Sequence, residues 1–89
     1  MKKKINTNNL NNPARLKWAC RRGMLELDVL LANFFEKMYS NLSARDKQLF
    51  ADLLEYSDPE LFNWLMGMTE PADKKILSIV KKIRSHAHS

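Results

Sequence analysis

The strongest constraint on the fold is the spacing of apolar residues, which recurs at intervals of three and four along the chain. Between residues 24 and 39, six large apolar side chains form one stripe: Leu27, Leu30, Leu31, Phe34, Phe35 and Met38. This period places side chains on one face of an α-helix. No segment alternates polar and apolar residues over the length of a strand. The chain is therefore predicted to be all-α.

Capping signals mark both ends of the first predicted helix. Asn12 suits an N-cap and Pro13 the first helical position, so a helix is predicted to begin there. It is expected to run to Arg22 and to end at Gly23, which takes the left-handed conformation common after helices. The second predicted helix covers residues 24–39.

Three further helices are predicted in the second half of the chain. The third begins at Ser43, an N-cap residue, and the fourth at Asp58, also read as an N-cap. Gly67 is expected to close the fourth helix, and residues 69–71 to open the fifth. The prediction is a compact bundle of five short helices.

The length of 89 residues is enough for one domain. Residues 1–11 are polar and rich in Asn and Lys, and are predicted to be a flexible, disordered tail. The helical domain is placed at residues 12–85, and residues 86–89 are expected to fray.

Cysteine usage and hydropathy point to a cytoplasmic protein. Cys20 is the single cysteine, whereas small secreted domains normally carry pairs. The basic residues 2–4 are followed by a polar stretch, unlike a signal peptide. No stretch approaches the ~20 apolar residues of a membrane span, so no membrane insertion is expected.

The net charge of +5 conceals an uneven distribution. All ten acidic residues lie within residues 26–73. The charged residues of the segments on either side are all basic. Proteins that bind nucleic acids gather positive charge on one face, whereas this acidic middle would repel phosphate. The basic ends are interpreted as solvated, and no nucleic-acid binding is expected.

The residues that could carry chemistry are few. His86 and His88 lie two apart in a polar tail, although a helix needs a spacing of three or four to place both on one face. No metal site is therefore expected. Cys20 lies beside two arginines, which can lower a thiol pKa, but the helical pattern turns it inward with Leu16. With no catalytic residue and no nucleotide-binding glycine motif, the chain is predicted not to be an enzyme.

Two surface features remain as candidate binding sites. Arg15, Trp18 and Arg22 fall at i, i+3 and i+7 of the predicted first helix, and Trp beside Arg is typical of interface hot spots. The alternative is that Trp18 belongs to the core and that the two arginines only form its solvated edge. At the following corner, Gly23 leaves the backbone bare, so that a partner can approach closely beside an exposed Met24. Helix capping alone accounts for the charges at this corner, but not for an exposed methionine.

The run of residues 18–28, WACRRGMLELD, resembles the signature of the SdhE family, the flavin-assembly factors of succinate dehydrogenase. The family's R-G-x-x-E motif is matched by Arg22, Gly23 and Glu26. Residues 58–65, DPELFNWL, resemble its D-P-x-L-x-x-W-L segment. The resemblance covers roughly residues 12–83, and the two blocks together at this spacing are specific. The longer Lys- and Asn-rich start is the visible departure.

The resemblance implies a five-helix assembly factor that binds the flavoprotein subunit of succinate dehydrogenase, with fumarate reductase as a further candidate client. It would promote covalent attachment of FAD to that client and hold no cofactor stably itself. Arg22 and Glu26 would contact the client, with Gly23 as the point of close approach; Arg15, Trp18 and Met24 are added from the residue pattern alone. The chain is expected to be a monomer. An antitoxin-like or regulatory protein-binding module is the alternative.

Overall fold

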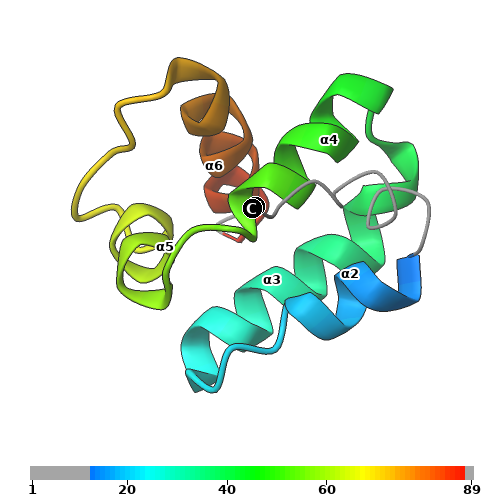
Figure 1. Ribbon diagram of the computed structural model, residues 1–89, viewed down its shortest axis with the longest axis horizontal. Helices are drawn as coiled ribbons and strands as arrows, with labels where there is room; N and C mark the ends of the chain where they lie inside the picture. Colours follow the sequence, from blue (N-terminus) through cyan, green and yellow to red (C-terminus); the bar gives the residue numbers. More distant parts are fainter. Residues whose placement is uncertain (1–12, 88–89) are drawn as a thin grey trace.

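The two longest helices, α3 (Leu25–Met38) and α6 (Lys74–Ala87), form the frame of the fold (Figure 1). The computed structural model describes residues 13–87. Within that range the other elements are α2 (Pro13–Ala19), the 3₁₀ turn η1 (Tyr39–Asn41), α4 (Ala44–Leu53) and α5 (Asp58–Leu65). The predicted all-α class is confirmed. The tail predicted at 1–11 and the Asn12 cap lie outside the described residues.

Helix α6 is the common packing partner, because it contacts α3, α4 and α5. In Figure 1 it stands between α4 and α5, with α3 running beneath them. Its buried face carries only β-branched residues, namely Ile76, Ile79, Val80 and Ile83. These residues recur at intervals of three and four positions, so they form one stripe of α6, and this stripe packs against all three neighbouring helices.

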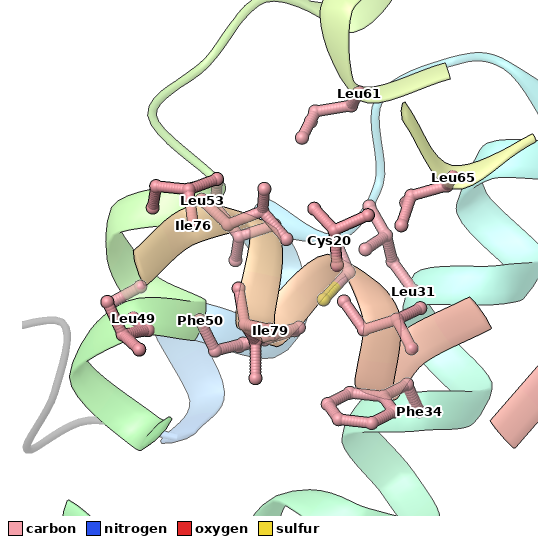
Figure 2. Packing of buried hydrophobic residues seen from close by; sticks show 14 of the residues in the cluster. Cys20, Leu31, Phe34, Leu49, Phe50, Leu53, Leu61, Leu65, Ile76 and Ile79 are labelled. Carbon is pink, nitrogen blue, oxygen red and sulfur yellow. The ribbon is translucent and has the colours of Figure 1, made fainter. Parts of the chain in front are cut away.

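A single hydrophobic core joins all five α-helices. Figure 2 shows side chains of α3, α4, α5 and α6 converging with Cys20, which follows α2; among them are Phe34 of α3 and Phe50 of α4. The centroids of these two rings lie 5.6 Å apart in a tilted arrangement. Cys20 is 1% exposed and lies within this cluster, where it acts as a small apolar residue.

The first helix is shorter than predicted. Helix α2 ends at Ala19, and the chain turns through Cys20 and Arg21 before it reaches Gly23. Gly23 does adopt a positive φ of 90°, but it lies in the loop and does not close the helix directly. The prediction took Gly23 as the residue that ends the helix, whereas α2 ends at Ala19 and the Arg22 side chain is turned toward the protein.

The predicted cap of α4 is confirmed, because the hydroxyl of Ser43 accepts a hydrogen bond from the backbone of Asp46 at 3.1 Å. The cap of α5 is Ser57, not Asp58. Ser57 and Glu60 form a reciprocal capping box, in which each side chain accepts from the other residue's backbone. Asp58 therefore lies inside the first turn, where its carboxylate is available for another partner.

Helix α6 also differs from prediction at both ends. It begins at Lys74, not at residues 69–71, because Asp73 caps it by accepting from the backbone of Lys75 at 2.8 Å. It continues to Ala87, beyond the boundary predicted at residue 85. His86 is thus part of the helix, and its ring meets the edge of Phe34 at a centroid distance of 5.9 Å. Between residues 13 and 87, no helix is long and apolar enough to cross a membrane.

The environment of Cys20 predicts an unreactive thiol. Burial raises its pKa from 9.0 to about 12, and this effect outweighs the opposing charge of Arg22. The reactive thiolate is therefore depleted about a thousandfold at pH 8 relative to an ordinary cysteine. We expect labelling by a thiol reagent at pH 8 to be slow in the native protein and fast in 6 M guanidinium chloride. Rapid labelling without denaturant would contradict the buried placement.

Candidate functional site

The corner between α2 and α3 holds the residues that the sequence singles out. We call residues 22–26 the motif corner; in Figure 1 they form the bend where the chain passes from α2 into α3. Met24 is the N-cap of α3 in an extended conformation, without a side-chain cap. The corner therefore needs other contacts to fix its path.

Arg22 supplies most of these contacts, because its guanidinium is turned into the protein. Its Nε donates to Asp58 Oδ1 at 2.8 Å, which forms an ion pair between the corner and α5. Its two terminal nitrogens donate to backbone carbonyls of Ala19, Leu54 and Tyr56, at distances of 3.2, 2.8 and 2.9 Å. Four of the five guanidinium N–H groups are thus engaged, and the side chain is only 17% exposed.

Asp28 fixes the same corner from the other side, and the sequence analysis did not select it. Its two carboxylate oxygens accept from the backbone N–H groups of Arg22, at 2.7 Å, and Gly23, at 3.1 Å. These hydrogen bonds lower the pKa of Asp28, and the one from the Arg22 backbone has the largest effect. The signal was present in the sequence, since an acid in the first turns of a helix often reaches back to preceding backbone donors.

Gly23 lies in open space. A Cβ atom placed on it would meet no atom within 4 Å, so side-chain clash does not explain the glycine. Its φ of 90° does explain it, because this left-handed backbone conformation strains residues that carry a side chain. The bare, exposed backbone also leaves room for close approach by a partner.

Glu26 has the opposite character to Arg22. It lies in the first turn of α3 with an exposed side chain. Among residues 13–87 its side chain makes no hydrogen bond or ion pair, so its carboxylate is available to another molecule. The predicted contact pair is therefore divided by the fold: Arg22 is used internally and Glu26 faces outward.

The remaining predicted residues are not gathered into one cluster. Trp18 is 71% exposed, so it is not a core residue, and Arg21 rather than Arg22 lies over its ring, at 5.3 Å from the centroid. Arg15 is exposed on the same helix. Met24, expected to be exposed, is half-buried and packs against the core. Arg22 does not share a helix face with Arg15 and Trp18, contrary to the prediction, because α2 ends before that residue.

An apolar groove next to the motif corner was not predicted. It has a volume of about 470 Å³ and is lined by residues of α3, the end of α5 and the end of α6: Leu25, Glu26, Val29, Leu30, Leu65, Met66 and Ala87. Leu25 is 79% exposed and Val29 about half exposed. Leu25 was overlooked because it does not belong to the apolar stripe of α3 that the sequence analysis identified.

The second sequence block contributes to the hydrophobic core and to the ion pair with Arg22. Leu61, Trp64 and Leu65 enter the core, and the Trp64 ring meets Tyr56 edge-on at 4.9 Å. Asp58, the first residue of this block, is the ion-pair partner of Arg22. The two blocks are thus in direct contact, although Arg22 and Asp58 are 36 residues apart.

The corner has features that suit recognition of another molecule. Cys20 is buried with a raised pKa, which removes the candidate nucleophile. No cluster of three potential metal ligands occurs in the described part of the chain. The corner combines one available carboxylate, a bare backbone and an adjacent apolar groove.

The different roles of Arg22 and Glu26 predict different effects on stability. Arg22→Ala removes hydrogen bonds to a carboxylate and three carbonyls, so we expect the free energy of unfolding to fall by about 2–3 kcal/mol. Glu26→Ala should change it by no more than about 0.5 kcal/mol. Urea unfolding followed by circular dichroism measures both. Equal effects of the two substitutions would contradict this division.

The pKa of Asp28 gives a second test. Because its pKa is lowered in the folded protein, its carboxylate stabilises the corner fully above the usual value of 3.8 and loses this effect as pH falls through the lower, folded value. We expect the backbone amide signals of Arg22 and Gly23 to titrate together below pH 3.8 in NMR spectra. Independent titration of the two amides would contradict a shared carboxylate.

Known proteins resemble this chain both in sequence and in fold. Residues 14–87 match the Sdh5 family, described as flavinator of succinate dehydrogenase. The protein named FAD assembly factor SdhE from Yersinia pseudotuberculosis is 53% identical over 76 residues, covering 85% of this chain and 86% of that relative. Its namesake from Shewanella oneidensis is 51% identical over 78 residues, covering 88% and 95%.

The fold is also similar to that of a solved structure. A solution structure of a UPF0350 protein is 40% identical, with a TM-score of 0.72, and covers 99% of this chain and 87% of that one. The family match spans nearly all the described residues, including both sequence blocks and the motif corner. The chain therefore belongs to the Sdh5 family of succinate dehydrogenase flavinators, which confirms the resemblance on which the sequence prediction rested.

Proposed function

We propose that this chain binds the flavoprotein subunit of succinate dehydrogenase and promotes the covalent attachment of FAD to it. Relatives that are about half identical over most of the chain are named FAD assembly factors, which supports this assignment. The observation that carries the proposal is the motif corner, where an outward-facing Glu26 lies on a backbone braced from within by Arg22. The flavoprotein subunit of fumarate reductase is proposed as a second client.

In this proposal the chain is a binding partner and not an enzyme. The bond forms between the client and the flavin, so the assembly factor needs no nucleophile, in keeping with the buried Cys20. FAD remains on the client, and the assembly factor holds it only indirectly. A monomer is sufficient, because the whole corner comes from one chain.

The proposed mechanism is selection of one client conformation. A ligand that binds one conformation more tightly shifts the population toward it by its difference in affinity. Glu26 would accept hydrogen bonds from the client at the contact, and the bare backbone of Gly23 would allow close approach. Arg22 would act as a positioning residue that holds Glu26 and the Gly23 backbone in place. Arg15 and Trp18 would extend the contact from α2.

The test is the covalent flavin content of the client, read as in-gel flavin fluorescence in cells that lack this gene. The wild-type gene should restore the signal, and Glu26→Ala should not, because removing one partner of a desolvated charged contact costs about 2–5 kcal/mol. Glu36→Ala is the matched control, since Glu36 is also an exposed glutamate of α3 but lies outside the groove. It should restore the signal fully.

Two results would contradict the proposal. If client flavin is unchanged when the gene is absent, the chain has no role in its attachment. If Glu26→Ala restores the signal as well as Glu36→Ala does, the contact lies elsewhere on the surface. Equal amounts of each variant, checked by immunoblot, separate loss of contact from loss of protein.

A further inference from the structure

The apolar groove beside Glu26 is a larger surface than the R-G-x-x-E motif alone provides. Its walls come from three helices, and Leu25 and Glu26 belong to both the groove and the motif corner. The groove is therefore continuous with the proposed contact. Leu25, Val29 and Met66 expose apolar surface there, in contrast to the mainly polar exposed face of α6.

We infer that this groove receives a segment of the flavoprotein client in which an apolar side chain is flanked by a lysine or arginine. This inference rests on the proposed function and extends it to the chemistry of the client segment. Charge complementarity favours this occupant, because Glu26 is the one charged residue among those lining the groove and its side chain has no partner in the described chain. An apolar anchor fills the groove while the adjacent cation pairs with the Glu26 carboxylate.

The shape of the groove supports a short segment with one or two anchors. Its volume of about 470 Å³ lies within the range of pockets that hold compact ligands. Of the lining residues from the end of α5, Leu65 is buried and Met66 is 36% exposed. Methionine adapts to different apolar shapes, which suits a groove that accepts the corresponding segments of two related clients.

The first experiment identifies the occupant directly. A photoreactive benzoylphenylalanine is placed at Val29 inside the groove or, as control, at Met68, which is 59% exposed and does not line it. Each variant is irradiated with the purified apo-flavoprotein subunit of succinate dehydrogenase, and cross-linked peptides are mapped by mass spectrometry. We expect the Val29 position to capture one client segment with an apolar residue next to a lysine or arginine, and the Met68 position to capture none.

Other cross-links overturn the inference. Capture of a second copy of this chain would make the groove a dimer contact, and capture of residues 1–12 would make it an intramolecular site. A captured client segment without a cation would remove the role given to Glu26. Equal capture from Val29 and Met68 would show that the groove is not selective.

The second experiment separates this inference from the proposed function. Binding of the apo-flavoprotein subunit is measured by titration for the wild type, Glu26→Ala, Leu25→Gln with Val29→Gln, and Met68→Gln as control. We expect the groove variant to weaken binding by about tenfold or more, and Met68→Gln to leave it within about twofold. Because the substituted residues are exposed, thermal unfolding should be similar for all four proteins.

The pattern of results is diagnostic. If the wild type does not bind the client, the proposed function fails and the groove inference falls with it. If binding depends on Glu26 but the groove variant matches Met68→Gln, the proposed function stands and the groove inference is wrong. Exchanging charges, Glu26→Lys with Lys or Arg→Glu in the captured segment, should restore binding if the two residues pair.

Discussion

The hydrogen-bonded guanidinium of Arg22 is the interaction on which the candidate site depends. It joins three separate parts of the chain: the end of α2 through Ala19, the α4–α5 connection through Leu54 and Tyr56, and α5 through Asp58. Lysine carries its three donors on a single nitrogen and cannot reproduce this planar arrangement. The arginine of the R-G-x-x-E motif and the aspartate of the second sequence block therefore form one structural unit, and each has its full effect only when the other is present.

The long-range ion pairs give the uneven charge distribution a structural meaning. Arg22 pairs with Asp58, Lys82 with the buried Asp46 at 2.5 Å, and Arg84 approaches Glu70 at 4.0 Å. Each pair joins a basic segment near one end of the chain to the acidic middle. The basic ends are therefore not simply solvated, as the sequence analysis assumed, because part of their charge is neutralised within the fold. This pairing also opposes the formation of one continuous basic face.

The sequence predicted the helices well because their apolar period is strong, and it predicted their ends less well. Ser43 was found because an N-cap acts through neighbouring backbone groups, and local signals of this kind can be read from sequence. The end of α2 was misplaced: the helix ends at Ala19, and Arg22, which lies beyond it, donates hydrogen bonds to the carbonyls of Leu54 and Tyr56, more than 30 residues away. The inward turn of Arg22 and the groove lined by α3, α5 and α6 both depend on tertiary packing, so neither leaves a local signal.

The R-G-x-x-E motif thus combines two functions that a sequence pattern cannot separate. Its arginine acts within the molecule and its glutamate faces out, while the glycine provides a backbone conformation that connects them. Because the corner is held by Arg22 and Asp28 before any partner arrives, little ordering of its backbone remains for the moment of binding. Association is stronger when the loss of conformational entropy has already taken place during folding. A small domain with a modest core can in this way present a rigid contact, since the rigidity comes from a few specific hydrogen bonds and does not require a large interface.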